Sequence, residues 1–444
     1  MYSLFGGYSG DQSDFRGTHR ISRQIVRTLD AVCYAGAGAG LSPSDGSRDM
    51  PTTSTILPRP YSSGEMPTID LERAEEVERR HQLLAAHLKN RGDDALLLRQ
   101  PSNIAWLTCG GEVRRPGTDQ PIAAVFVTCE ARVILCHAVD APFLFEHQLV
   151  GLGFQAKERP WEEDPEVLIR DLCRGRRVAS DTPHPDHRNA MPELRDFRCQ
   201  LVDSELVKLR QLGRHLAHAV EATAKTFDHR ETEAEVAGQV AHRLLRHGIT
   251  PVQIQVIADG RGRRLRHWGF SQQPVERSCV VSAIGRRDGL HCGVARTVCF
   301  GQPLPGLLDE HQQAGLVMAS AIYFSQAGWE LRETWQRVQR IYEKFGVGDE
   351  WRASDQGQVT GYEMQEVRVV PDCPYRLSAA TPIYWHPSVH TAALGDTIVV
   401  HGESTEQVTR PEDWPKLVVH VKGTQVPVPD VLCRESSFNA DGRT

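Results

Sequence analysis

The order of helical and strand-like segments in the second half of the chain constrains its fold most strongly. Two amphipathic stretches, at 205–227 and 232–248, predict a pair of helices because their apolar residues recur with helical spacing. Strand-like segments follow. Then 308–328 and 330–345 predict a second helix pair ahead of a second group of strands. A helix pair followed by strands therefore occurs twice, which is typical of an internal duplication, although no residue-level repeat accompanies it.

A smaller α/β domain is expected before this duplicated region. Asp70 can cap a helix whose apolar residues fall on one face, and Gly92 follows as a C-terminal stop. Apolar runs then alternate with helical stretches, a pattern typical of α/β domains. The strand-like runs are ALLL, AAVFVTC, RVILC and RRVASD, and the helical stretch before the last of them is PEVLIRDLCRG. We predict one domain at 66–202 and a second at 203–444.

Residues 1–65 differ from everything that follows. They contain 9 Gly, 10 Ser and 4 Pro, and such a segment buries too little apolar surface to offset its ordering entropy. Two interpretations stay open. The segment is a disordered tail, or it is an extension from a mis-assigned start and the chain begins at Met66. It has no basic start followed by an apolar run, so no secretory signal is expected.

Composition excludes several classes of protein. Hydrophobic residues make up 40% and charged residues 24% of the 444 residues, as in globular proteins. No window approaches the roughly 18 apolar residues of a membrane helix, so no membrane association is predicted. A net charge of −6 and a pI of about 6.3 disfavour nucleic-acid binding. The eleven cysteines include no CxxC pair, so we expect reduced thiols in a cytoplasmic protein rather than a zinc ribbon.

Motif-like segments recur along the globular part of the chain. They are PSNIAWLTCG, GRGRRLRHW, AIGRRDGLHCGVARTVCFG, GQVTGYEMQE, IYWHPSV and ALGDTIVV. In this order and spacing they resemble the creatinase, aminopeptidase P and prolidase family, the Xaa-Pro peptidases, over about residues 68–433. The resemblance implies an α/β fold with a creatinase-like N-terminal domain and a pita-bread C-terminal domain of catalytic type. It also implies a homodimer.

The resemblance also identifies the positions that hold metal in that family. Its metallopeptidases bind two divalent ions through two Asp, one His and two Glu, and the ions activate a bridging water. By position, these ligands correspond here to Ala283, Gly293, Gln358, His386 and Gly395. Alanine and glycine side chains offer no lone pair, and neither the glutamine nor the histidine brings negative charge. We therefore expect no metal, no other cofactor and no metallopeptidase activity of the usual kind.

His267 is the residue of this region that most resembles a catalytic group. Creatinase works without metal and uses a histidine at this position as a proton shuttle together with carboxylates, and a histidine titrates near neutrality. His267 and Glu366 are therefore the candidate catalytic pair, although His267 as an inert pocket residue stays open. The candidate ligand-binding residues are Gln358, Gln365, His386 and Arg296.

Two further interpretations concern the same region. His267, His386 and Glu366 could converge as a single-metal site, with His291 and His390 as additional ligands. The arginine run at 261–266 could grip an anionic ligand bidentately, or it could be a solvated loop.

Three functional hypotheses follow. The first is a divergent Xaa-Pro peptidase-like pseudoenzyme that binds a peptide, a small amide-like ligand or a partner protein. The second is a metal-independent, creatinase-like hydrolase or lyase of a small C–N compound that uses His267 and Glu366. The third is a pure interaction module that makes no use of its pocket.

Overall fold

The computed structural model describes residues 69–435 except 116 and 268. All of these residues belong to one compact unit. The expected tail at 1–65 and the alternative start at Met66 lie outside the described residues, and the domain boundaries at 202 and 203 stay predictions. No helix among the described residues is long and apolar enough to cross a membrane.

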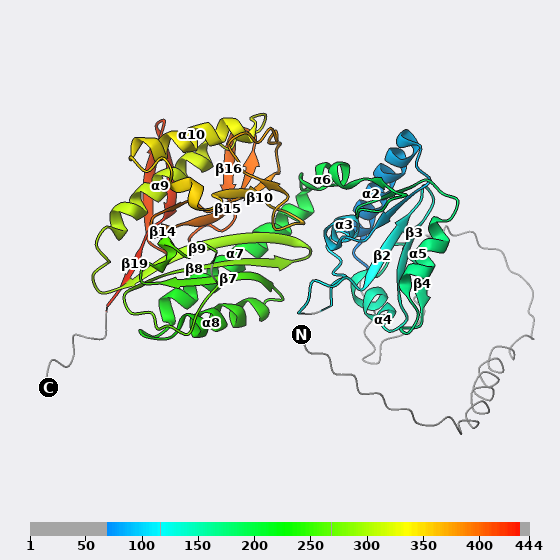
Figure 1. Cartoon of the computed structure of the whole chain (residues 1–444), viewed down its shortest axis with the longest axis horizontal. Helices are drawn as coiled ribbons and strands as arrows, with labels where there is room; N and C mark the ends of the chain where they lie inside the picture. Colours follow the sequence, from blue (N-terminus) through cyan, green and yellow to red (C-terminus); the bar gives the residue numbers. More distant parts are fainter. Residues whose placement is uncertain (1–68, 116, 268, 436–444) are drawn as a thin grey trace, which may run out of the picture. The chain divides into compact units, whose positions relative to one another are not determined.

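The N-terminal part contains a six-stranded mixed sheet with helices on both faces (Figure 1). Its strands run in the order β4-β3-β2-β1-β5-β6, and β1 pairs antiparallel with β2 but parallel with β5. The strands are β1 (Ala95–Leu98), β2 (Ala123–Val127), β3 (Arg132–His137), β4 (Gln155–Arg159), β5 (Val178–Ser180) and β6 (Arg188–Asn189). The helices are α2 (Leu71–Arg91), α3 (Pro101–Leu107), α4 (Ala141–Phe143), α5 (Pro165–Cys173) and α6 (Met191–Arg198), and a π-helical turn spans Leu144–Gln148.

Local sequence signals explain where the first helix begins and ends. Asp70 accepts a hydrogen bond from the backbone N–H of Arg73 at 2.9 Å, and Gly92 follows the helix with a φ of 73°, a conformation in which glycine carries no steric penalty. Both expectations are confirmed. Alternation along β1 places Leu96 and Leu98 in the core beside α2 and α3, and Leu97 in the core beside α5.

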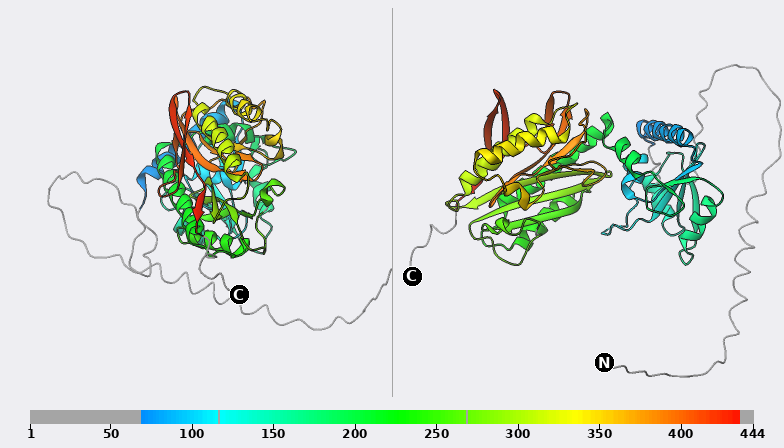
Figure 2. Two further views of the ribbon diagram at one scale, coloured as in Figure 1. Left: turned by 90° about the vertical axis from the view of Figure 1, so that its left-hand side faces the viewer. Right: turned by 45° about the horizontal axis from the view of Figure 1, so that its top comes forward.

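The C-terminal part is built on a nine-stranded sheet with two helix pairs, and the expected repeat of helices and strands is confirmed (Figures 1 and 2). Its helices are α7 (Asp203–Thr226), α8 (Glu233–Leu245), α9 (Leu307–Phe324) and α10 (Leu331–Lys344), with 3-10 turns at Arg261–Arg263 and Glu350–Ala353. The sheet order is β11-β10-β12-β15-β9-β8-β7, with β16 on β15 and β19 on β9. These strands are β7 (Thr250–Ala258), β8 (Ser278–Arg287), β9 (Leu290–Phe300), β10 (Gly357–Val359), β11 (Val367–Arg368), β12 (Pro382–Trp385), β15 (Gly395–His401), β16 (Ser404–Gln407) and β19 (Leu432–Arg434). Two small sheets pair β13 (Ser388–Val389) with β14 (Ala392–Ala393), and β17 (Lys416–Val421) with β18 (Thr424–Pro429).

Each helix pair covers its own half of this sheet. Helices α7 and α8 share an apolar core with β7, β8 and β9, whereas α9 and α10 share a second core with β10, β12 and β15. The capping box expected at Thr232 is also confirmed. Glu235 N donates to the Thr232 hydroxyl at 3.2 Å, and Thr232 N donates to the Glu235 carboxylate at 2.7 Å.

The sequence TGYEMQEVRVV, at 360–370, predicts a strand, but the segment between β10 and β11 departs from it. Residues 360–366 form turns, and Gly361 has a φ of 155°. The carboxylate of Glu366 folds back to accept a hydrogen bond from the backbone N–H of Glu363 at 2.9 Å.

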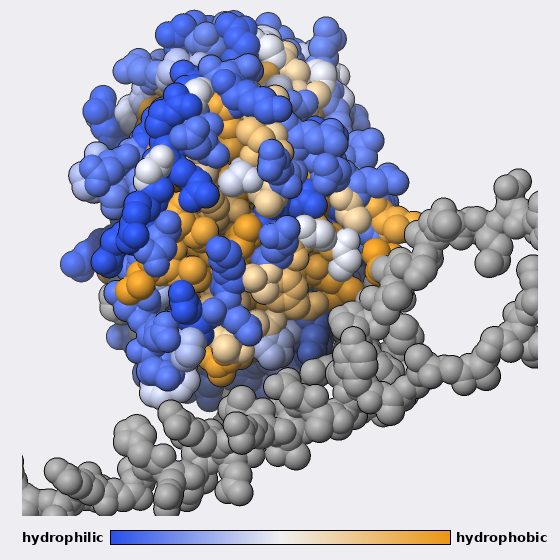
Figure 3. Space-filling view, turned by 90° about the vertical axis from the view of Figure 1, so that its right-hand side faces the viewer, coloured by the Kyte–Doolittle hydropathy of each residue, from blue (hydrophilic) through white to orange (hydrophobic). Residues whose placement is uncertain are grey.

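The molecular surface in Figure 3 is largely hydrophilic, with apolar areas between the polar side chains. The large apolar residues most exposed among those described include Leu71, Val139, Trp161 and Leu245. Scattered exposed apolar residues are usual on globular proteins. These residues do not identify a dimer interface, and the expected homodimer stays a prediction.

Candidate functional site

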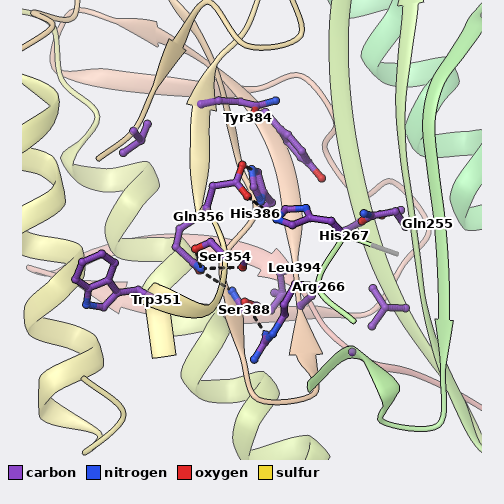
Figure 4. Close-up of a pocket in the computed structure, with 18 of the residues that line it drawn as sticks. Gln255, Arg266, His267, Trp351, Ser354, Gln356, Tyr384, His386, Ser388 and Leu394 are labelled. Atoms are coloured by element: carbon purple, nitrogen blue, oxygen red, sulfur yellow. Dashed lines mark hydrogen bonds and ion pairs between the residues drawn. The ribbon is translucent and has the colours of Figure 1, made fainter. Parts of the chain in front are cut away.

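A cavity of about 660 Å³ lies in the C-terminal part, against the strands of the large sheet. One wall is formed by β7 and β8, and the other by β10, β12 and the segments before and after them (Figure 4). Of the residues singled out from the sequence, His267, Gln358, Gln365, His386 and Ala283 line this cavity. Glu366 and Arg296 do not.

Asp355 connects two of the three histidines that line the cavity, His267 and His386. Its carboxylate oxygens lie 3.1 Å from His267 Nε2 and 3.8 Å from His386 Nε2, and the two imidazoles are close together in Figure 4. Asp355 is the only carboxylate among the described residues that line the cavity. Burial lowers the pKa of His386, and the charge of His267 acts in the same direction, whereas Asp355 opposes it. His386 is therefore held mainly as the neutral imidazole at neutral pH.

Sequence reasoning missed Asp355. It lies in the segment after the 3-10 turn Glu350–Ala353, and its distance in sequence from His267 carries no periodic signal. His386 comes directly after β12, and its ring lies 4.7 Å, centroid to centroid, from the ring of Tyr384, tilted by 32°. The pair expected from the sequence, His267 with Glu366, is not brought together. Asp355 is the carboxylate beside His267.

Tyr384 fills the space beside two of the expected ligand positions. A Cβ atom on Gly293 would lie 2.7 Å from three atoms of the Tyr384 ring, and a Cβ on Gly395 would lie 2.7 Å from the Tyr384 hydroxyl oxygen. Real Cβ atoms almost never approach so closely, so glycine is required at both positions while the ring stays there. Along β12, Ile383 and Trp385 enter the core beneath α9, so alternation directs Tyr384 into the cavity.

The alternation of side chains along β8 turns the Ala283 side chain, at another of the expected ligand positions, into the core. Ala283 packs in the apolar core shared with α7, together with Val281. The side chains of β8 that face the cavity are therefore those of Ser282 and its alternate neighbours. Ser282 donates to the amide oxygen of Gln255 on β7 at 3.3 Å. The Gln255 amide nitrogen is buried and has no hydrogen-bond partner among the described residues.

Two predicted ligand-binding glutamines form one hydrogen-bonded chain. Gln365 Nε2 donates to the Gln358 amide oxygen at 3.2 Å, and Gln358 Nε2 donates to the Met364 carbonyl at 2.9 Å. The pairing holds both amides at the cavity wall, with Gln358 on β10 opposite Tyr384 on β12. Amide groups in this arrangement can both donate to and accept from a ligand.

Glu366 is occupied elsewhere. Both of its carboxylate oxygens accept hydrogen bonds from Arg198 Nε, at 2.8 and 2.9 Å, and the arginine Nη2 lies 2.8 Å from Oε2. Both side chains are buried, and Arg198 also donates to Asn103. Burial raises the pKa of Glu366, against the hydrogen bonds from Arg198 that lower it. The carboxylate thus fastens the 360–366 turns to α6 and does not face the cavity.

Arg296 likewise has a structural place. It is buried and donates to Glu221 at 2.8 Å and to Asp396 at 3.0 Å. Asp396 also accepts from the Thr409 hydroxyl at 2.8 Å. These bonds join β9 to α7 and β15. No part of Arg296 lines the cavity.

The remaining polar candidates are divided among different partners. Arg261 donates to Glu233, whereas Arg266 donates to Glu350 and lines the cavity. His291 lies against the carbonyl of Gly361 at 3.0 Å, and His390 pairs with Glu350 at 3.2 Å. Within 69–435, outside the two omitted residues, no group of three or more His, Cys, Asp or Glu is arranged to hold a metal ion.

Comparison with known proteins identifies the fold. A scan against protein-family models and a search of curated proteins found no match. Among solved structures, dipeptidase PepE from Mycobacterium ulcerans is similar with a TM-score of 0.66 and 16% identity, over 82% of this chain and 99% of that one. The prolidase from Pyrococcus horikoshii OT3 gives 0.65 and 16%, over 77% and 99%. The expected fold, a creatinase-like N-terminal α/β domain followed by a pita-bread domain, is confirmed.

One similar structure bears the name of a protein of another kind. The N-terminal domain of FACT complex subunit SPT16 from Cicer arietinum, the chickpea, gives a TM-score of 0.57 with 13% identity, over 76% of this chain and 96% of that one. At such identities the likeness concerns the fold alone.

Proposed function

We propose that this chain is a divergent, Xaa-Pro peptidase-like binding protein that takes up a peptide or small amide-like ligand without metallopeptidase chemistry. The observation that carries the proposal is the ring of Tyr384 beside Gly293 and Gly395. Carboxylate side chains at those two positions would collide with the ring. The fold is that of solved dipeptidases and prolidases, but the described side chains that line the cavity do not form a dinuclear metal centre.

The residues present do not fit the two metal ions that the fold family implies. A dinuclear centre needs several anionic oxygen ligands, because two divalent cations must be neutralised. Asp355 is the only carboxylate among the described lining residues, and it already pairs with His267. The amide of Gln358 is neutral and hydrogen-bonded to its neighbours. The cavity therefore lacks the charge that such a centre requires.

The chemistry of the wall suits an amide ligand. Five glutamines line the cavity, at positions 253, 255, 356, 358 and 365. The buried Gln255 nitrogen without a partner could donate to a ligand carbonyl and recover the hydrogen bond that it lacks. The indoles of Trp335 and Trp351 also line the cavity and offer apolar contact. The SPT16 domain, named as part of a subunit of a complex, supports the use of this fold for binding.

Metal content and turnover test the first half of the proposal. The untagged full chain, freed of excess metal, is analysed by elemental mass spectrometry and incubated with alanyl-proline and added Mn²⁺ or Co²⁺. We expect neither two bound ions per chain nor release of proline. Two ions per chain together with proline release would overturn the proposal.

Ligand binding tests the second half. Alanyl-proline is titrated into the chain while the intrinsic tryptophan fluorescence, to which Trp335 and Trp351 contribute, is followed. Gln255→Ala should weaken binding about tenfold, because a hydrogen bond to a buried amide is lost. Gln336→Ala on α10 is the matched control, since Gln336 is exposed and outside the cavity. Equal affinities of the Gln255→Ala and Gln336→Ala variants would contradict the assignment of the cavity.

A second candidate function has one specific observation in its favour, the 3.1 Å contact between His267 and Asp355. In a metal-independent hydrolase or lyase of a small C–N compound, His267 would move the proton and Asp355, in place of Glu366, would orient the imidazole. Under this candidate, His267→Gln and Asp355→Asn both abolish turnover of a small amidine or urea compound. Under the binding proposal, the wild-type chain already shows none.

Location and assembly complete the proposal. We infer a cytoplasmic homodimer. Every cysteine in the described part of the chain is free, which suits a reducing compartment. Light scattering of the purified chain tests the dimer, and a monomer at micromolar concentration would contradict it.

A further inference from the structure

A second cavity, of about 600 Å³, lies wholly within the N-terminal part, beside α5 and β5. Arg99 follows β1 and Thr182 follows β5, two parallel strands that end at the same edge of the sheet. In open α/β sheets, ligands bind outside the carboxyl ends of the strands. The position of this cavity is therefore one at which the fold can hold a ligand.

The lining of this cavity is apolar on one side. Leu97, Ile169 and Cys173 contribute to it, and all three belong to the apolar cluster beneath α5. Leu97 and Ile169 are buried. They offer a surface on which the body of an organic molecule can rest.

Positive charge dominates the rest of the lining. Four arginines line the cavity, at positions 99, 170, 174 and 176, against the two carboxylates of Glu166 and Asp186. Arg99 pairs with Glu166, and Arg176 donates to the Leu172 carbonyl. Arg174 pairs with Asp171, outside the cavity lining, at 2.8 Å. The Arg170 side chain forms no ion pair or hydrogen bond with any residue that the structure describes, so its guanidinium is available to a ligand.

Hydroxyl and imidazole groups complete the lining of the cavity, and one of the imidazole nitrogens has no hydrogen-bond partner within the part of the chain that the structure describes. The hydroxyls of Ser180 and Thr182 lie 3.1 Å apart. The imidazoles of His184 and His187 stack with their centroids 3.9 Å apart. His187 Nδ1 is buried and has no hydrogen-bond partner among the described residues. A buried nitrogen of this kind is expected to find a partner, and a ligand in the cavity could supply it.

We propose that this cavity binds an organic anion, whose phosphate or carboxylate group is held by the arginines and whose apolar body rests on Leu97 and Ile169. Guanidinium groups bind both kinds of oxyanion bidentately. The apolar surface favours an anion with a hydrophobic body over a small inorganic ion. Among the described residues, the site shares no lining residue with the cavity around Tyr384. The proposal of an anion site is therefore independent of the function proposed above.

Titration with three matched aromatic probes tests this site. 1-Naphthyl phosphate, 1-naphthoate and neutral 1-naphthol are titrated into the full chain at constant ionic strength, and binding is followed by equilibrium dialysis. We expect at least one anion to bind about tenfold or more tightly than the naphthol, because charge-assisted hydrogen bonds form only with the anions. The tighter of the two anions shows whether the cavity prefers a phosphate or a carboxylate group.

Three variants locate the binding. Arg170→Ala should weaken binding of the preferred anion about tenfold, whereas Arg79→Ala on α2, which removes an exposed arginine elsewhere, should leave it unchanged. Gln255→Ala alters the other cavity and should also leave it unchanged. The proposal is overturned if neither anion binds better than 1-naphthol, or if Arg170→Ala binds as the wild type does.

Discussion

Two groups of residues within the family-like segments meet opposite environments. Glu366 and Arg296 are buried, each fastened by a charged partner that joins separate elements of the fold. His267 and His386 instead lie at a cavity, linked through the single carboxylate of Asp355. Glu366 and Arg296, which lie in the motif-like segments, thus stabilise the fold and do not line the cavity. The positions that the resemblance assigns to metal are Ala283, Gly293, Gln358, His386 and Gly395.

The physical reason for this division is the cost of removing each kind of residue. A buried ion pair that loses one partner leaves an uncompensated charge, which destabilises the fold strongly. His267, whose side chain is 62% exposed, pairs only with Asp355, and exposed pairs contribute at most about 1 kcal/mol. The first group is therefore held in place by folding, whereas the second is free to follow function.

The largest effect is expected from Arg198→Ala. The substitution leaves the Glu366 carboxylate buried without its partner, so the free energy of unfolding should fall by about 3–5 kcal/mol. Urea unfolding followed by circular dichroism measures it. Arg195→Ala on the same helix is the control. The Arg195 side chain is 43% exposed, and its ion pair with Asp196 is long, at 3.9 Å. A loss below about 1 kcal/mol for Arg198→Ala would break the comparison, since exposed pairs contribute that little.

Gly293→Ala is expected to come second. The added methyl group would meet the Tyr384 ring at 2.7 Å, and overpacking of this kind costs about 1–3 kcal/mol. Thermal unfolding measures the loss. In the double variant Gly293→Ala with Tyr384→Ala, the cost of the methyl group should largely disappear, because the ring is gone. Simple additivity of the two changes would show that the ring does not occupy this space.

Acid should destabilise the chain through His291. Burial lowers the pKa of His291 to about 3, so the folded protein holds it neutral while the unfolded chain protonates it near its ordinary pKa of 6.5. The stabilisation is present above pH 6.5 and is lost as the pH falls toward 3, by about 1.4 kcal/mol for each pH unit in between. Unfolding measured from pH 7 to pH 5.5 should show this decline, with His291→Gln reducing the slope by up to one proton. An unchanged slope would contradict the assignment.

The smallest effect on stability is expected from His267→Gln. The side chain is 62% exposed, and exposed substitutions usually change stability by less than about 0.5 kcal/mol. Differential scanning calorimetry measures it against the wild type. A loss above about 2 kcal/mol would place His267 with the structural group and would remove the contrast on which the comparison rests.

Much of the fold could be predicted because its signals are local. The helix that begins after Asp70 and ends before Gly92, and the capping box of Thr232 with Glu235, depend on residues a few positions apart. The strand expected from TGYEMQEVRVV, at 360–370, is interrupted by turns. The reason is that Glu366 bonds both to Arg198 and back to the Glu363 backbone, and the first of these contacts spans 168 positions.

The candidate site could be predicted only in part. The motif segments brought His267, Gln358, Gln365 and His386 to one cavity, as the resemblance implied. They gave no sign of Asp355 or of the buried Gln255 nitrogen, because neither residue type is unusual at its place in the sequence. The face on which the Ala283 side chain lies could not be read from the sequence either, because Ala283 lines the cavity while its side chain packs in the core shared with α7. A shift of one residue turns a strand side chain to the opposite face, and only the paired register shows which face is which.

The sequence by itself determined the order of helices and strands and the caps that bound them, and it fixed which residues stand at the positions that the resemblance assigns to metal. Only the tertiary structure decided what lies beside those residues. Tyr384 approaches Gly293 from a strand 91 positions away, and Asp355 comes between two histidines that are 119 positions apart. Such placements follow from strand pairing and from the burial of the alternate face. They arise from the sum of many distant contacts, and no short stretch of sequence records them.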